Sequence, residues 1–219
     1  MVRPRRAAGA PHPVSKAPLM DVAAQRIYHL THVDNLPGIL EAGALLADAT
    51  PAVDISAAHT RELRRGTDIG AGESVARFVP FFLTPNSTVW EGMRSGDEDD
   101  RLAPEALEAE AYDFVMLVST IGTAAEGETV VADGDAAGSL TRFAATKDAS
   151  ERMLRRLHDD EDSIIAAEFL VRETFPFESV TLIGVANDRA RATVKTILQS
   201  SAYRPKVAVY PPWFQKPEA

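Results

Sequence analysis

The 219-residue sequence contains no cysteine, so neither a disulfide framework nor a thiolate metal site can form. It has no HExxH motif, and a metal site therefore has no support. Its longest apolar runs, residues 114–118 and 164–171, are far shorter than the roughly 18 to 20 residues that span a bilayer. We therefore expect a cytoplasmic protein that needs neither a metal nor a membrane.

Two common catalytic signatures are also missing. The glycine-rich segment GTDIGAGES lacks the terminal G-K-[ST] of a P-loop and follows no clear strand. Ser87 and Ser119 lack the G-x-S-x-G context of a hydrolase nucleophile. P-loop NTPase and serine hydrolase chemistry are disfavoured.

Basic residues are outnumbered by acidic ones, 23 to 32, and the resulting net charge of −9 argues against nonspecific binding to nucleic acid. The charge is unevenly spread, because the acidic excess lies in residues 91–110 and 159–162. Arg61, Arg64, Arg65 and Arg77 cluster elsewhere. A local positive site is compatible with the acidic average.

The N-terminal segment MVRPRRAAGAPHPVSKAP is basic and rich in proline and alanine, without the apolar stretch of a signal peptide. We predict a flexible basic tail over residues 1–20, with a DNA-contacting arm as the alternative. Residues 21–219 are expected to form a single domain, because 45% of the chain is hydrophobic and the rest shows no linker or repeat.

Local patterns predict a strand over residues 26–32, an Asp34-Asn35 cap, and a helix from residue 36 that Gly43 ends. A second short helix is expected over 55–63 and a strand over 78–83, where Pro80 indicates an edge or bulged position. Residues 87–107 are predicted to be a mobile loop leading into a short helix.

The remaining pattern alternates strands with helices. Strands are predicted at 112–119, 129–132, 164–171, 179–185 and 207–209, and helices at 149–157 and 188–198. This alternation favours a mixed α/β domain with a doubly wound sheet.

Glu168 stands within the apolar run IIAAEFLV. An ionised carboxylate buried on a strand costs several kcal/mol unless it is paired or lines a cleft. Glu168 therefore either faces solvent or an arginine, or it belongs to a functional site; the pattern alone leaves both open.

Polar groups also gather at the first junction between strand and helix, namely Tyr28, His29, Thr31, His32, Asp34 and Asn35. Such groups can hold the ribose and amide of a nucleotide, and a helix N-terminus favours an anion. The run RELRR, residues 61–65, offers guanidinium groups that suit pyrophosphate. Core histidines and a solvated helix face are the ordinary alternatives.

Four segments, in this order, resemble the DarT family of DNA ADP-ribosyltransferases. YHLTHVDNLPGILEAGALL resembles its NAD-binding signature and FVPFFLTPNS resembles its VPFYF-type strand. AEFLV, with Glu168, resembles the strand of its catalytic glutamate, and VAVYPPWFQ resembles its C-terminal ending. The resemblance spans about residues 27–214.

The resemblance implies an α+β fold, with a split, mostly antiparallel β-core around an NAD cleft and flanking helices. It thereby replaces the doubly wound expectation. It also implies a toxin that transfers ADP-ribose from NAD to thymine or guanine of single-stranded DNA, held in check by a macrodomain antitoxin. Other acceptors (protein, RNA or water) and an inactive binding module remain alternatives.

The family's roles carry over to particular positions. Glu168 matches the catalytic glutamate, which would stabilise the oxocarbenium-like state as nicotinamide leaves. His32, Thr31 and Asn35 match the NAD-binding signature, and His29 and Leu36 lie in the same segment. The family's required arginine corresponds to Arg61 or Arg65, with Arg61 preferred.

Two segments depart from the family pattern. GTDIGAGESVARF replaces a proline-rich stretch that commonly ends in tyrosine, and the acidic NSTVWEGMRSGDEDD lies beside the expected DNA path. Trp90 and Tyr112 could stack on an exposed base, although packing is the more common role. These departures leave the acceptor open.

Overall fold

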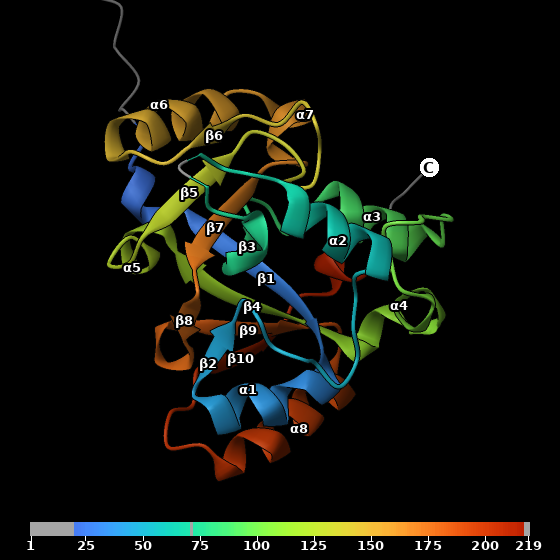
Figure 1. Ribbon diagram of the computed structural model, residues 1–219. Coiled ribbons are helices and arrows are strands. Elements are labelled where there is room, and N and C mark those ends of the chain that lie inside the picture. Colours follow the sequence, from blue (N-terminus) through green and yellow to red (C-terminus); the bar gives the residue numbers. More distant parts are fainter. Residues whose placement is uncertain (1–19, 71, 217–219) are drawn as a thin grey trace, which may run out of the picture.

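The computed structural model describes residues 20–70 and 72–216 (Figure 1). The predicted tail over residues 1–20 therefore lies, except for residue 20, outside the described residues. Within the described ranges, no helix is long and apolar enough to cross a membrane.

The described residues form ten strands: β1 Arg26–His32, β2 Ala44–Leu46, β3 Phe78–Phe82, β4 Phe114–Thr120, β5 Thr129–Ala132, β6 Phe143–Ala144, β7 Glu168–Arg172, β8 Thr174–Pro176, β9 Leu182–Val185 and β10 Lys206–Val209. The α-helices are α1 Leu36–Ala42, α2 Ala58–Gly66, α3 Thr88–Ser95, α4 Pro104–Glu108, α5 Ile121–Ala124, α6 Lys147–His158, α7 Glu161–Ile164 and α8 Asp188–Ile197.

Eight strands form one sheet in the order β10-β9-β4-β1-β3-β7-β5-β6, and β2 pairs with β8. All neighbours run antiparallel except β10 and β9. The expected doubly wound parallel sheet is wrong, because β9 and β10 form its only parallel pair of neighbours. The α+β fold that the resemblance implied is confirmed.

The large sheet is split in its middle. β1 pairs with β4 along its whole length, and β3 pairs with β7 over residues 78–82. Between β1 and β3, in contrast, the only register pair is Tyr28 with Phe82. Two half-sheets therefore meet at this junction, where Figure 1 shows β1 and β3 side by side.

Pro80 lies at this junction, and the prediction of an edge or bulged position for it was wrong. The Pro80 carbonyl receives a hydrogen bond from His29 Nδ1 on β1 at 2.8 Å. Because N and O of one residue point to the same side of a strand, the absent Pro80 N–H also faces β1. A proline is tolerated inside this sheet because the strands part there.

Side chains on the two faces of the sheet enter different cores. Along β4, Val115 and Leu117 join a core with α1, α6 and α8, whereas Phe114, Met116 and Val118 face α3, α4 and the C-terminal segment. This alternation is the period of two expected for a strand covered on both faces. In Figure 1, α6 and α7 lie at one end of the molecule and α1 and α8 at the other.

Several predicted elements match the structure and others do not. The strand over 26–32 and the helix over 36–42 are confirmed, with Gly43 at φ 68° accepting the left-handed position that ends α1. The predicted mobile loop over 87–107 contains α3 instead, whose N-cap Ser87 accepts a hydrogen bond from Trp90 N–H. The apolar run 164–171 begins as the end of α7 and becomes a strand only at Glu168.

Candidate active site

Glu168 is the first residue of β7 and is only 5% exposed. Its Cα pairs with Phe82 on β3 and with Ala132 on β5. Phe82 in turn pairs with Tyr28 on β1. The carboxylate therefore lies one strand from the point where the two half-sheets meet.

Two donors hold the Glu168 carboxylate. Ala136 N–H donates to Oε1 at 2.8 Å, and Arg64 Nη1 lies 3.1 Å from Oε2 and 3.4 Å from Oε1. Of the possibilities that the sequence left open for Glu168, the structure shows burial against an arginine rather than exposure to solvent. The pair is oriented by charge-assisted hydrogen bonds, which are stronger than neutral ones.

Helix α2 carries the three arginines of the RELRR run, and each has a different environment. Arg61 hydrogen-bonds to the carboxylate of Asp54 and to the Ser56 carbonyl. Arg65 is exposed. Of the three, Arg64 is the one that reaches Glu168; neither Arg61 nor Arg65, the two singled out from the sequence, contacts that carboxylate.

His29 fills the junction between the half-sheets. Because the Pro80 carbonyl can only accept, His29 Nδ1 carries the proton of their hydrogen bond and Nε2 is the free acceptor. Burial lowers the pKa of His29, and the hydrogen bond to Pro80 opposes this only in part. The imidazole is therefore neutral at pH 7.

His32 ends β1 and caps the helical turn that follows. Its Nδ1 accepts a hydrogen bond from Asp34 N–H at 3.2 Å, so the neutral ring carries its proton on Nε2. The ring packs edge-on against Phe114, with centroids 5.5 Å apart. Nε2–H is the donor that this residue can offer to a ligand.

Asn35 ties β1 to the segment that leads into α2. Its Nδ2 donates to Thr31 Oγ1 at 3.1 Å and to the Val53 carbonyl at 2.8 Å, and its Oδ1 accepts from Val53 N–H at 2.8 Å. Leu36, beside it, has 0% exposure. Strand alternation places His29 and Thr31 on one face of β1 and His32 on the other, so the structure does not bring all five predicted NAD-binding side chains to one face.

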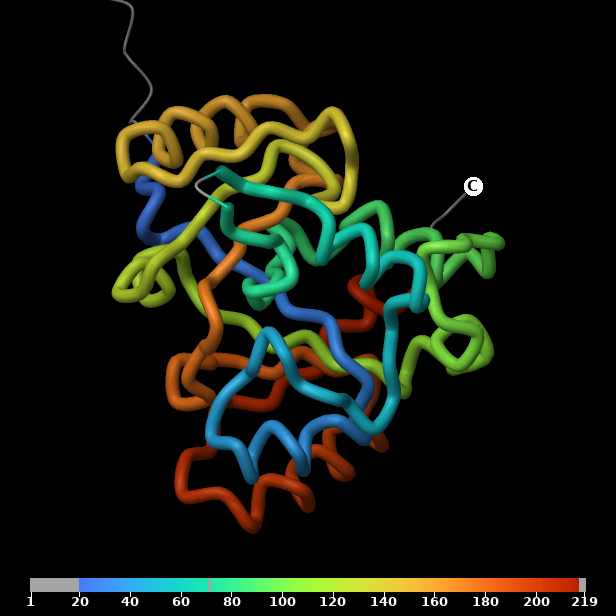
Figure 2. The backbone as a smooth tube through the Cα atoms, viewed as in Figure 1, coloured from blue at the N-terminus to red at the C-terminus, as the bar shows by residue number. Residues whose placement is uncertain are grey.

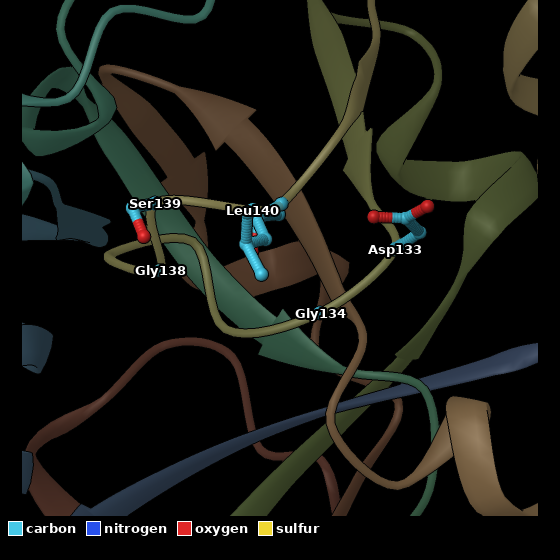
Figure 3. Close-up of a pocket in the computed structure, with 6 residues that line it drawn as sticks. Asp133, Gly134, Gly138, Ser139 and Leu140 are labelled. Atoms are coloured by element: carbon cyan, nitrogen blue, oxygen red, sulfur yellow. The ribbon is translucent and has the colours of Figure 1, made fainter.

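The loop between β5 and β6 borders the site through Ala136. Residues of this loop border a shallow, open depression of about 410 Å³ (Figure 3). The depression is lined by Asp133, Gly134, Gly138, Ser139, Leu140 and Thr141. Leu140 is 93% exposed, an unusual position for a large apolar side chain.

The two aromatic residues proposed for base stacking differ in environment. Trp90 is 1% exposed, packs edge-on against Phe114 and Phe214, and donates Nε1–H to the Trp213 carbonyl. Tyr112 is 48% exposed. Trp90 is thus a core residue, and only Tyr112 has a surface free for contact.

Sequence reasoning missed Arg64 and Ala136 as partners of Glu168. Arg64 lies within the RELRR run, but helical spacing alone does not tell which of its arginines turns inward. Ala136 acts through its backbone N–H, which leaves no signal in the side-chain pattern. Clusters of three or more potential metal ligands do not occur among the described residues.

Solved structures share this fold. The structure of Thermus sp. 2.9 DarT in complex with ADP-ribosylated ssDNA aligns with a TM-score of 0.73 and 26% identity, covering 87% of this chain and 96% of that one. The same protein in complex with NAD⁺ aligns with a TM-score of 0.68 and 25% identity, covering 87% and 97%. The fold and the relatives define the class: this chain is an NAD-dependent DNA ADP-ribosyltransferase, for which NAD is the substrate.

Sequence comparison gives the family. Residues 28–215 match the family model described as ssDNA thymidine ADP-ribosyltransferase, DarT. The chain belongs to the DarT family. Among curated relatives, the DNA ADP-ribosyl transferase of Mycobacterium tuberculosis is 28% identical over 193 residues, covering 78% of this chain and 81% of the relative. That of Thermus sp. 2.9 is 28% identical over 213 residues, covering 86% and 95%.

Proposed function

We propose that this chain transfers ADP-ribose from NAD to a thymine base of single-stranded DNA and that Glu168 is its catalytic carboxylate. The observation that carries the assignment is the burial of Glu168 one strand from the junction of the half-sheets, where Arg64 and Ala136 orient its carboxylate. Family membership supports the thymine acceptor. The residue roles are the new part of this assignment.

Departure of nicotinamide leaves positive charge on the ribose. A carboxylate held near the ribose hydroxyls stabilises that charge, as in glycosidic bond cleavage generally. Glu168 is already held by two donors, and only part of the acceptor capacity of its two oxygens is used. It can therefore accept hydrogen bonds from ribose hydroxyls without first being reoriented.

Arg64 is the arginine that we assign to the reaction, in place of Arg61 or Arg65. Its Nη2 is buried and has no hydrogen-bond partner among the described residues. A buried donor without a partner costs about 1–3 kcal/mol, which an incoming oxygen acceptor removes. A pyrophosphate oxygen of NAD or a carbonyl oxygen of the base has the required chemistry.

The NAD-binding roles divide between direct and indirect ones. We assign His29 Nε2 and His32 Nε2–H, on opposite faces of β1, as polar groups available to NAD, with Thr31 on the same face as His29. Asn35 uses both amide hydrogens within the protein, and Leu36 is buried. The last two therefore act by holding the chain that surrounds the substrate.

We further propose that the chain is a cytoplasmic toxin and that a macrodomain antitoxin removes the ADP-ribose it attaches. The structure of Thermosipho africanus DarTG in complex with ADP-ribose aligns with a TM-score of 0.67, at 18% identity, and this chain covers 51% of it. That larger protein shows the shared fold, and its name joins the transferase with a second component.

The test is mass spectrometry of single-stranded oligonucleotides incubated with the protein and NAD. One oligonucleotide contains thymine among the other bases and a second of equal length lacks it. We expect an ADP-ribose adduct on the first alone, abolished in Glu168→Gln. Glu128→Gln, at an exposed carboxylate beside β5, is the matched control and should retain activity.

Each other outcome is informative. Adducts on the thymine-free oligonucleotide would assign guanine or another base. Release of nicotinamide without any DNA adduct would point to protein, RNA or water as acceptor. Full activity of a folded Glu168→Gln variant would remove this residue from the catalytic site.

A further inference from the structure

Arg101 lies outside the motifs that indicated function, yet it contacts both segments that hold Glu168. Its guanidinium is clamped by Asp99, with Nε 2.9 Å from Oδ1 and Nη2 2.6 Å from Oδ2. The remaining arm, Nη1, donates to Asp135 Oδ2 at 3.1 Å. Arg101 thus connects the segment between α3 and α4 with the loop between β5 and β6.

Asp135 organises the turn that reaches the carboxylate. Its Oδ1 accepts from Ala137 N–H at 2.8 Å, and its carbonyl accepts from the Thr141 hydroxyl at 2.6 Å. Ala136, which lies between Asp135 and Ala137 in the sequence, donates its N–H to Glu168. Because one turn contains all these bonds, the direction of the Ala136 N–H depends on where Asp135 is held.

The backbone of Arg101 contacts the second segment. Its carbonyl accepts from Ala57 N–H at 2.9 Å and from the Thr60 hydroxyl at 2.8 Å, both at the start of α2. Thr60 and Arg64 are four residues apart and therefore lie on the same side of α2. The Arg101 carbonyl thereby sets the position of the helix that brings Arg64 to Glu168. In Figure 2 the start of α2 runs beside the segment that precedes α4.

We propose that Arg101 is a positioning residue that holds both donors of Glu168, the Ala136 N–H and the Arg64 guanidinium, in the arrangement that transfer requires. The proposal rests on the proposed function, in which Glu168 is the catalytic carboxylate. Arg101 is separated from the carboxylate by Asp135 and Ala136 on one side and by α2 on the other. Its side chain acts through the first route, and its backbone through the second.

Neutralising the Arg101 side chain tests the first route. Arg101→Gln removes the connection to Asp135 and leaves the backbone carbonyl at α2. We expect kcat for DNA modification to fall about 10- to 100-fold, since small displacements of a catalytic group cost this much. KM for NAD should stay within about twofold, because Arg101 does not touch the substrate in this proposal.

Partner variants make the test specific. Asp135→Asn should lower kcat to the same extent, and Arg101→Gln with Asp135→Asn should be no worse than either change alone. Arg101→Lys, which keeps the charge but loses the fork that spans both carboxylates, should retain intermediate activity. Arg142→Gln is the control, since Arg142 pairs with Asp133 in the same loop and is 72% exposed; its kcat should equal that of the wild type.

The outcomes separate this proposal from the assignment of function. A wild-type protein that modifies no oligonucleotide contradicts the proposed function before Arg101 is considered. If the wild type is active and Arg101→Gln, folded by its melting curve, keeps kcat within twofold, the positioning role is wrong. It is also wrong if KM rises at constant kcat, if the losses at Arg101 and Asp135 multiply, or if Arg142→Gln is equally impaired.

Discussion

At the scale of single residues, the pair of Glu168 and Arg64 combines a stability requirement with a chemical one. The side chains are 7% and 16% exposed, so each charge depends on the other for compensation. In the proposed reaction the carboxylate also has to be held in place before NAD arrives. Substituting either partner therefore changes folding and activity together, and the two effects have to be measured separately.

Arg64→Gln is expected to destabilise the protein by about 3–5 kcal/mol, because it leaves the Glu168 charge buried without its partner. Pairing Arg64→Gln with Glu168→Gln should recover much of that stability while activity stays at least about 100-fold below wild type. Denaturant unfolding and adduct formation are the two measurements. Recovery of activity in the double variant would contradict the catalytic role of Glu168.

His29 gives a prediction about pH. Its pKa in the folded protein is lowered from 6.5 by burial, so the unfolded chain binds the proton more readily than the folded chain. The corresponding stability is fully present above pH 6.5 and is lost as the pH falls through the lowered pKa of the folded state. We expect the free energy of unfolding to decrease between pH 7.5 and 5.5, with a shallower decrease in His29→Gln. Equal slopes in urea titrations of the two proteins would show that His29 is not responsible.

Residue types with a strong chemical preference could be predicted from the sequence, whereas their partners could not. A buried carboxylate in an apolar run needs a partner for its charge or a site that uses it. This requirement made Glu168 a candidate from the sequence alone. The choice among Arg61, Arg64 and Arg65 depends on the rotation of α2 about its axis. That rotation is set by contacts of α2 with Asp54 and with the Arg101 carbonyl, and the second of these is distant in the sequence.

At the scale of elements, predictions held where local signals decide and failed where pairing decides. The β1 and α1 unit combines β-branched and aromatic residues, a helix start and Gly43, all of which act within a few residues. The edge or bulged position predicted for Pro80 was wrong because β1 and β3 part beside it, so no N–H is needed there. This parting is a long-range feature. The polar composition of residues 87–107 concealed α3, whose buried face consists mainly of Trp90.

The contact between Gly184 on β9 and Trp213 in the C-terminal segment allows a prediction at this scale. A Cβ at Gly184 would lie 2.6 and 2.8 Å from ring atoms of Trp213, which itself stacks on Tyr210 at 4.3 Å. Gly184→Ala should therefore displace the segment and lower stability by about 1–3 kcal/mol. Gly92→Ala within α3 is the control: its added Cβ meets nothing within 4 Å, and the change should stabilise by about 0.5–1 kcal/mol. Thermal unfolding of both variants measures the difference.

At the scale of the whole molecule, the order of the strands could not be predicted from composition or periodicity. Alternating strands and helices fit a parallel sheet as well as an antiparallel one. The split antiparallel core was predicted from the resemblance to a family. The charge of −9 has a clearer consequence. A DNA-modifying protein with this charge must attract its substrate through a local site while its overall field repels it.

The acidic segment before Arg101 allows that balance to be tested. Asp97 and Glu98 are exposed and lie close in sequence to Asp99 and Arg101. Glu41 and Glu178 are also exposed, and they belong to α1 and to the turn after β8, both of which lie away from α3 and α4 (Figure 1). The double variant Asp97→Asn with Glu98→Gln should lower KM for the oligonucleotide by about two- to fivefold at low salt. At about 0.5 M salt this decrease in KM should vanish, because screening removes the repulsion. The same two-charge change at Glu41 and Glu178 alters net charge equally, so a comparable gain there would mean that total charge, rather than the position of the acidic segment, governs the approach of DNA. A gain confined to Asp97 and Glu98 would place the path of the strand along the segment that also carries Arg101, and would thereby join substrate approach and the positioning of Glu168 in one part of the chain.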